Sequence, residues 1–254
     1  MPTASPSFQP VAQQGIGQPL YRVVMRRLLG AIESGDLEPG TALPSERVLA
    51  SQFEVSIGTL RQAVGELVAG HILVRRQGRG TYVAQHNAER FLFQFFHVER
   101  TDGLREVPEL ETLSFERGHL DEEQADALQT RAGSAAITIE NRLRLQGRPV
   151  VLDRLTLPAA MFKGLTESRL RSRPSTIYRF YQDEYGITVA RALERVRAVA
   201  ADRHVARQLG VVPGAPMLQV RRTALSIGDK PVEYRVSTIS TGLHEYVHSL
   251  TRPA

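Results

Sequence analysis

The sequence contains no cysteine, only two lysines (Lys163 and Lys230) and no long apolar run. The absence of cysteine excludes disulfides, thiolate nucleophiles and cysteine-based zinc sites, and it agrees with a cytoplasmic protein. No stretch approaches the roughly 18 apolar residues that a membrane span needs, so we expect no membrane partner. Residues 1–17 lack the basic start and apolar core of a signal peptide, and their polar composition predicts a disordered tail.

Positive charge is what the chain has in excess. Its formal net charge is +5, and all but two of the cations are arginines. A basic excess suits a polyanionic partner such as nucleic acid, but many basic proteins bind none. With 254 residues the chain is long enough for one large domain or two ordinary ones. The number of domains therefore has to be judged from the order of the predicted helices and strands.

The first third of the chain predicts three helices and a hairpin. Apolar residues at positions 20, 24, 28 and 32 predict a helix over 19–34. Ser45 is placed to cap a second helix that runs to Phe53, and after a break at 54–56 a third helix is predicted over 57–69. Residues 72–76 and 81–83 predict two strands around an Arg- and Gly-rich turn. This order is typical of a winged helix-turn-helix.

The segment LPSERVLASQFEVSIGTLRQAVGELVAGHILVRRQGRGTYV resembles the DNA-binding domain of the gluconate-repressor (GntR) family, and the resemblance covers residues 18–86. It implies that the third helix enters the major groove of double-stranded operator DNA and that the hairpin lies along the minor groove. The implied contacts are Arg47, Ser56, Thr59, Arg61 and Gly78, with Gln77 and Arg79 beside them. Ile57 and Gly58 stand where many members carry an arginine, so we expect different base contacts there, with Ile57 against a thymine methyl group.

The remaining residues, 87–254, contain an internal repeat. Each copy has a polar helix, a strand, a glycine-containing turn and a second strand that opens with Pro-Val, over residues 121–157 and again over 202–239. Between the copies, residues 174–186 predict an aromatic helix capped by Ser175 or Thr176, and 187–199 predict a further strand. A helix and a hairpin used twice predict one antiparallel sheet with helices on one face, an α+β domain.

This second pattern is similar to the UTRA effector domain of the HutC subfamily, which has a chorismate-lyase-like fold, over residues 90–250. The resemblance implies a pocket within the sheet that binds a small anionic effector: a sugar phosphate, an amino-acid derivative or an organic acid. The matching positions are Arg142, Arg144, Asp153, Thr176, Tyr178 and Glu233. Residues 237–246 depart from the pattern of the relatives, which leaves the far side of that pocket open.

The chemistry of these residues agrees with an anionic ligand. Arg142 and Arg144 are two apart on a predicted strand, so they point to one face and can converge on a phosphate or carboxylate. Thr176 lies near a helix N-terminus, which favours anions. Asp153 and Glu233 can accept hydrogen bonds from hydroxyl groups or an amine. The alternative is that these arginines and carboxylates pair with one another across the sheet and bind no ligand.

Three classes of function stay open at this point. The first is a ligand-responsive DNA-binding regulator, which the family resemblance implies is a repressor released or modulated by a small anionic metabolite. It is expected to act as a homodimer on a pseudo-palindromic operator. The second is a DNA-binding architectural protein that senses no ligand. The third is an enzyme of the chorismate-lyase-like fold, for which the chain offers no HExxH pattern, no GxSxG and no phosphate-cradling loop. We therefore expect a regulator without catalytic residues, cofactor or metal site, in three segments: a tail (1–17), a winged helix-turn-helix domain (18–86) and an effector-binding and dimerisation domain (87–254).

Overall fold

The computed structural model describes residues 8–10, 18–86, 94–173 and 176–248. The chain folds as two compact units that divide between Gln85 and His86. Most of the predicted tail, and the candidate cap Ser175, lie outside the described residues. No helix in the described ranges is both long and apolar enough to cross a membrane.

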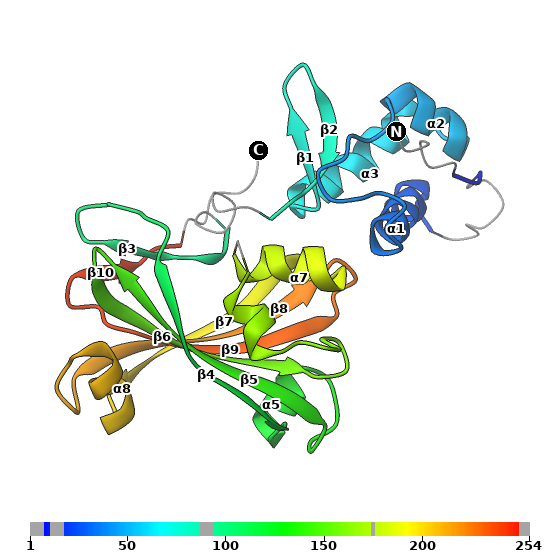
Figure 1. The fold of residues 1–254 in the computed structure, drawn as a ribbon. Coiled ribbons are helices and arrows are strands. Elements are labelled where there is room, and N and C mark those ends of the chain that lie inside the picture. The colour runs from blue at the N-terminus through cyan, green and yellow to red at the C-terminus, as the bar shows by residue number, and fades with distance from the viewer. Residues whose placement is uncertain (1–7, 11–17, 87–93, 174–175, 249–254) are drawn as a thin grey trace. The chain divides into compact units, whose positions relative to one another are not determined.

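The N-terminal unit contains three helices and a two-stranded hairpin, as the sequence predicts (Figure 1). The helices are α1 (Leu20–Glu33), α2 (Glu46–Phe53) and α3 (Ile57–Ala69), and the hairpin pairs β1 (Leu73–Arg76) with β2 (Gly80–Val83). Val24, Leu28, Phe53 and Leu60 are fully buried in this unit. The helices are therefore held by their apolar stripes, and their polar faces are left to solvent.

Two serines fix the helix-turn-helix. The side chain of Ser45 accepts a hydrogen bond from the backbone of Val48 and caps α2, and Ser56 caps α3 in the same way through Thr59. Between them, Glu54 ends α2 with φ of 53°, in the left-handed region. This one residue reverses the chain within a three-residue turn, so α3 starts at Ile57 as predicted.

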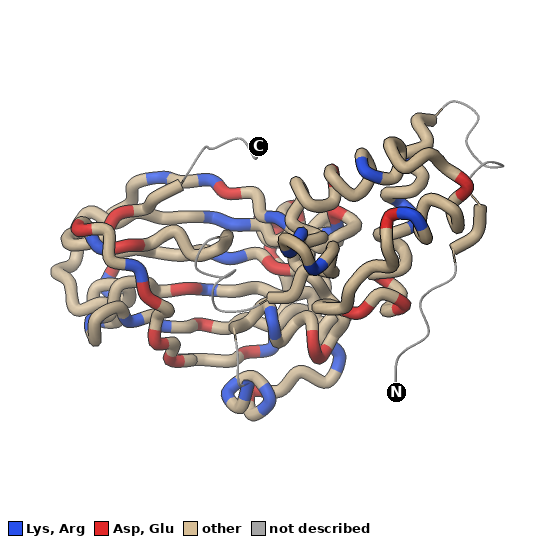
Figure 2. The backbone as a smooth tube through the Cα atoms, turned by 90° about the horizontal axis from the view of Figure 1, so that it is seen from above, with Lys and Arg blue, Asp and Glu red and all other residues tan. Residues whose placement is uncertain are grey.

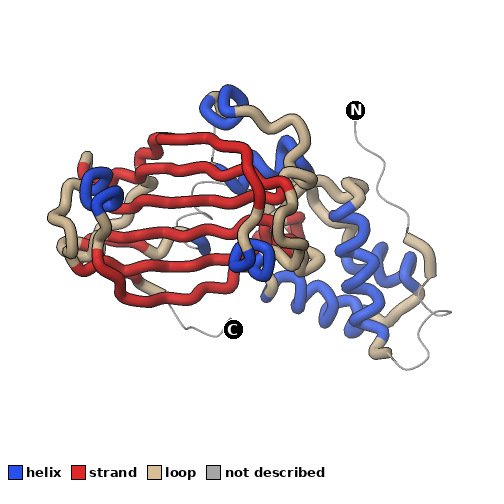
Figure 3. Tube along the Cα trace, turned by 90° about the horizontal axis from the view of Figure 1, so that it is seen from below, coloured by secondary structure: helices blue, strands red, loops and turns tan. Residues whose placement is uncertain are grey.

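The second unit is built on a six-stranded antiparallel sheet, which Figure 3 shows in red. The strand order is β4-β5-β6-β9-β8-β7. The strands are β4 (Glu109–His119), β5 (Ala135–Leu145), β6 (Arg148–Pro158), β7 (Val189–Ala200), β8 (Pro216–Ser226) and β9 (Pro231–Ile239). A separate ribbon pairs β3 (Val98–Arg100) with β10 (His244–Tyr246). The expected α+β fold with an antiparallel sheet is confirmed.

The sheet order shows how the repeat is used. Each copy contributes a helix, α5 (Glu122–Ala127) or α8 (Arg203–Leu209), and each helix is capped by an aspartate, Asp121 or Asp202. The hairpins β5-β6 and β8-β9 join through the pairing of β6 with β9. The strand before each helix, β4 or β7, lies at the outer edge of its half of the sheet. The repeating unit is therefore strand–helix–hairpin, one strand longer than the sequence pattern predicts.

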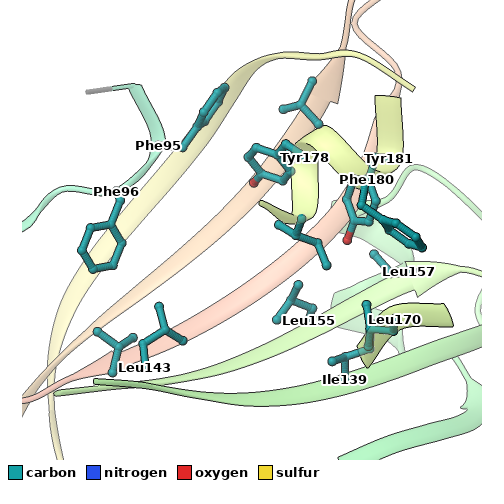
Figure 4. Close-up of a cluster of buried hydrophobic side chains, with 14 of the residues drawn as sticks. Phe95, Phe96, Ile139, Leu143, Leu155, Leu157, Leu170, Tyr178, Phe180 and Tyr181 are labelled. Atoms are coloured by element: carbon teal, nitrogen blue, oxygen red, sulfur yellow. The ribbon is translucent and has the colours of Figure 1, made fainter. Parts of the chain in front are cut away.

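Helices cover both faces of this sheet, so the expectation of helices on one face was wrong. α5 and α8 pack on the face that carries Ala136 and Leu152. The opposite face, called the inner face below, carries Ile137 and Val151 and packs against α6 (Glu167–Arg171) and α7 (Ile177–Tyr185). Figure 4 shows Tyr178, Phe180 and Tyr181 of α7 in this main core, with Phe95 beside them. The aromatic side chains of α7 supply the apolar area that this face needs.

Candidate functional site

The predicted DNA-contacting residues lie on the surface of the N-terminal unit, and all but the half-buried Thr59 are exposed. They lie on α2 (Arg47), at the start and first turns of α3 (Ser56, Ile57, Gly58, Thr59, Arg61) and in the turn between β1 and β2 (Gln77, Gly78, Arg79). Figure 2 shows that Lys and Arg are spread over both units, so charge alone does not locate a DNA surface. The N-terminus of α3 and the turn between β1 and β2 locate the candidate DNA surface more specifically than charge does.

The start of α3 is capped by a side chain. The Ser56 hydroxyl accepts from the Thr59 amide at 3.1 Å and lies 2.9 Å from the Thr59 hydroxyl, so both side chains serve first as the helix cap. Ile57 is 39% exposed, and a Cβ placed at Gly58 would meet nothing nearer than the Ser56 hydroxyl at 3.7 Å. At the hairpin tip, Gly78 has φ of 69°, a left-handed conformation that glycine adopts without strain.

Arg61 forms an ion pair within this surface. Its Nε lies 2.6 Å from Oε2 of Glu46, and the two side chains are 64% and 36% exposed. Exposed pairs of this kind contribute about 0–1 kcal/mol, so exchanging Glu46 for a DNA phosphate or guanine costs little. The pair links the first turns of α2 and α3, the helix that the resemblance assigns to the major groove.

We expect Arg61→Ala to weaken specific DNA binding about tenfold to a hundredfold, because it removes a contact worth about 1–3 kcal/mol. Fluorescence anisotropy on operator DNA across a salt series measures this loss. Arg154→Ala removes one exposed arginine from the second unit and is the charge-matched control. An Arg61→Ala protein that binds its operator as tightly as the wild type would overturn the recognition-helix assignment.

The second unit holds a cavity of about 650 Å³ on its inner face, a size typical of small-molecule sites. Strands β4, β5, β6 and β9 form one wall, and Arg171, Arg173, Thr176 and Ile177 form the other. The polar and charged lining residues are Glu111, Thr112, Asn141, Asp153, Arg171, Arg173, Thr176 and Arg235. The apolar lining comes from Val107, Pro108, Leu110, Leu143 and Ile177. Three arginines beside apolar walls suit a small anion.

The structure separates the six residues that the resemblance assigns to the effector. Asp153 and Thr176 line the cavity. Tyr178 and Glu233 are fully buried in the adjoining core and do not line it. Arg142 and Arg144 do not line it either. Arg142 donates to Glu111 at 2.7 Å and to the backbone of Gln208, which lies in α8 on the opposite face. These two arginines thus pair across the sheet, as the structural alternative describes.

Residue spacing alone missed the arginines of the cavity. Arg142 and Arg144 do share one face, but spacing does not say which face carries the pocket, and their neighbours Asn141 and Leu143 are the ones that line it. Arg235 sits two residues after Glu233, inside the second Pro-Val strand, where the alternation of β9 places it on the inner face. Arg171 and Arg173 lie in a segment whose sequence gives no periodic signal.

Arg235 connects the cavity to α7 through a buried network. Its Nη1 donates to Asp153 at 3.1 Å and its Nε to Glu233 at 2.9 Å. Glu233 also accepts from the hydroxyls of Tyr178 at 3.2 Å and Tyr181 at 2.7 Å. Burial, reinforced by the Glu233 charge, raises the pKa of Tyr178 to about 12, and the same causes raise the pKa of Tyr181 well above its usual value. Both phenols therefore remain protonated donors at neutral pH.

A second buried network lies beside the first. Arg222 donates to Glu194 at 2.6 Å and to the backbone oxygen of Phe95, and the Tyr246 hydroxyl also donates to Glu194. The His97 ring packs edge-on against Tyr246. Burial, together with the positive charges of Arg222, His248 and Arg105, lowers the pKa of His97 to about 4, while Glu194 opposes the shift. His97 is therefore neutral in the folded protein near neutral pH.

This lowered pKa predicts a pH-dependent stability. Between about pH 4 and 6.5, His97 is protonated in the unfolded chain and neutral in the folded protein. The free energy of unfolding therefore rises with pH across that window, and this contribution to stability is lost as the pH falls through it. In His97→Gln that rise should be shallower than in the wild type. Urea unfolding at several pH values measures it, and His119→Gln, which removes an exposed histidine, is the control. Equal pH slopes for His97→Gln and wild type would contradict the assignment.

One more contact ties α7 to the start of the second unit. The backbone N–H of His86 donates to Oε1 of Gln182 at 3.1 Å, and Nε2 of Gln182 donates to Thr188 at 2.9 Å. His86 follows the wing strand β2 by three residues. Helix α7 thus contacts the cavity at Ile177, the Arg235 network at Tyr178 and Tyr181, and the chain leaving the wing at Gln182.

Comparison with known proteins matches both units to described families. Residues 20–83 match the family described as bacterial regulatory proteins, gntR family, and residues 104–242 match the UTRA domain. The HTH-type transcriptional repressor NagR of Bacillus subtilis is 30% identical over 92% of this chain and 96% of its own length. The mannosyl-D-glycerate transport/metabolism system repressor MngR of Escherichia coli is 26% identical over 90% of this chain and 95% of its own.

Solved structures give the same result for the fold. The ligand-binding domain of a putative GntR-family transcriptional regulator from Bordetella bronchiseptica is 35% identical, with a TM-score of 0.59, over 63% of this chain and 99% of that one. PhnF from Mycobacterium smegmatis is 23% identical, with a TM-score of 0.52, over 92% of this chain and 100% of that one. The resemblance to the two-unit fold therefore extends over nearly the whole chain.

Proposed function

Since the chain belongs to the gntR family of bacterial regulatory proteins and carries a UTRA domain, we propose that it is a transcriptional repressor whose grip on operator DNA is changed by a small anionic effector. The observation that carries this proposal is the cavity of about 650 Å³ lined by Arg171, Arg173 and Arg235, in the same chain as an exposed helix-turn-helix. NagR and MngR are both named as repressors, which supports repression rather than activation of transcription.

The proposed mechanism is a shift between two placements of the DNA-binding units in a homodimer. The recognition helices α3 of two copies would read the half-sites of a pseudo-palindromic operator. An effector in the cavity contacts the start of α7, and α7 holds His86, which leads out of the wing. Coupling between two such sites is typically about 1–3 kcal/mol, or roughly 5–150-fold in affinity. In this proposal the protein is cytoplasmic and has no catalytic role.

The test is fluorescence anisotropy of the full chain on the DNA upstream of its own gene, compared with scrambled DNA. Phosphorylated sugars, amino acids and small organic acids are then added to the complex. We expect specific binding that at least one compound weakens about tenfold. Specific binding that no compound changes would instead support the architectural protein. If the upstream DNA is not preferred, selection from random sequences follows, and failure there to enrich any site would overturn DNA recognition.

A further inference from the structure

The hairpin of β1 and β2 carries positive charge only. Residues 71–85 include Arg75, Arg76 and Arg79 and contain no aspartate or glutamate. All three arginines are exposed, and no carboxylate among the described residues forms an ion pair with any of them. Figure 1 shows the hairpin projecting from the three helices of its unit. Cations placed in this way on a DNA-binding unit are available to phosphates.

The side chain of Arg76 has a defined place on this hairpin. Its Cζ lies 4.4 Å from the centroid of the Tyr82 ring, a distance at which the ring face attracts a cation. Arg76 pairs with Gly80, and Val74 pairs with Tyr82, so Arg76 and Tyr82 are diagonal neighbours on one face of the hairpin. Because Gly80 has no side chain, the guanidinium group can cross the hairpin to reach the ring.

Tyr82 is itself fixed at its backbone and at its hydroxyl. Its backbone forms a bridge with Ala42, and its hydroxyl donates to the backbone oxygen of Arg79 at 3.1 Å. The ring is half-buried. A guanidinium group that stacks on a ring uses its flat face and keeps its N–H edges for an acceptor such as a phosphate. The ring of Tyr82 therefore holds Arg76 as a hydrogen-bond donor next to the turn of the hairpin.

We propose that Arg76 binds a phosphate of the bound DNA and that Tyr82 is its positioning residue. This rests on the DNA-binding part of the proposed function. A mobile arginine loses side-chain freedom when it binds, and stacking on Tyr82 removes part of that loss before the DNA arrives. A phosphate contact carries no sequence information, so it adds affinity for operator and for other DNA alike. The alternative is that Arg76 only covers the ring and stabilises the hairpin.

Fluorescence anisotropy of the full chain on upstream and on scrambled duplex DNA, across a salt series, separates these two roles. Arg76→Met keeps an aliphatic cover over the ring and removes the charge. It should weaken binding to both DNAs about fivefold near physiological salt and lower the slope of log K against log salt by about 0.9. A purely structural role would leave that slope unchanged. Arg154→Met removes an exposed arginine from the second unit and should change neither quantity.

Two substitutions of Tyr82 test the positioning role. Tyr82→Phe keeps the ring and Tyr82→Leu removes it. In the Tyr82→Phe background, Arg76→Met should still weaken binding about fivefold, and in the Tyr82→Leu background its effect should fall to about twofold. Arg75 pairs with Thr81 on the other face of the hairpin and is the matched control. The effect of Arg75→Met should be the same in both backgrounds.

Two results would overturn the inference. One is a salt slope for Arg76→Met that equals the wild-type slope. The other is an equal dependence of the Arg75 and Arg76 effects on residue 82, which would mean that Tyr82 shapes the whole hairpin and does not position one arginine. Both results leave the proposed function standing if operator binding responds to an effector. A wild-type chain that binds scrambled DNA but prefers no operator would remove the proposed function and leave the phosphate contact of Arg76 intact.

Discussion

Replacing Arg235 with methionine is expected to lower the free energy of unfolding of the second unit by about 3–5 kcal/mol. The substitution leaves the carboxylates of Asp153 and Glu233 without their cation, in side chains that are only 4% and 0% exposed. Removing one partner of a buried network costs this much because the remaining charges stay desolvated. Urea unfolding followed by tyrosine fluorescence measures the loss, since the chain has seven tyrosines and no tryptophan.

The control for this variant is Arg154→Met, which removes an exposed arginine from the neighbouring strand β6. It should change the stability by less than about 0.5 kcal/mol. A deficit that matches that of Arg154→Met would contradict the role given to Arg235.

The N-terminal unit could be predicted almost residue by residue because its signals are local. A serine cap, an apolar stripe and a glycine stop each act within a few residues, and the observed bounds of α2 and α3 follow them. The ion pair of Arg61 with Glu46 could not be predicted, because it joins two helices whose relative rotation depends on packing. A contact that depends on how elements pack has no signature in the spacing of residues.

The second unit shows the same limit on a larger scale. The repeat predicts the two hairpins, since each carries its own glycine turn, and strand parity correctly places Arg142 and Arg144 together. Which face of the sheet carries the pocket depends on where α6 and α7 pack, and both helices come later in the chain. The alternation of side chains along a strand does not predict this. The cavity lining is therefore assembled from Asn141, Asp153 and Arg235, one from each of three strands.

The position of α7 offers a route by which ligand binding in the cavity affects the chain at His86. Ile177 at its start lines the cavity, Tyr178 and Tyr181 donate to Glu233, and Gln182 near its end accepts from the His86 N–H. A ligand that engages Arg235 or the helix N-terminus acts on a rigid element anchored at all three places. Movement at one end of such a helix is transmitted to the other, because buried packing resists deformation.

Gln182→Leu is therefore expected to uncouple effector binding from DNA binding. The wild-type ratio of operator dissociation constants with and without effector, roughly 5–150-fold for a typical coupling, should fall to about one. The leucine keeps the volume of the buried side chain but cannot accept from the His86 N–H, so this hydrogen bond between α7 and the chain that leaves the wing is lost. Anisotropy on operator DNA, with and without the effector identified by the compound panel, measures this ratio, and calorimetry measures the effector affinity itself.

Thr188→Val separates this contact from a general effect on the helix. It removes a different hydrogen bond of Gln182, the 2.9 Å bond to Thr188, and leaves the bond to His86 in place. Thr188→Val should keep the coupling, whereas Gln182→Leu should bind the effector and the operator and lose the dependence of one on the other. If both variants lose the coupling equally, the coupling depends on the packing of Gln182 and not on its hydrogen bond with His86. If Gln182→Leu responds to effector as the wild type does, coupling runs by a route that does not include the end of α7.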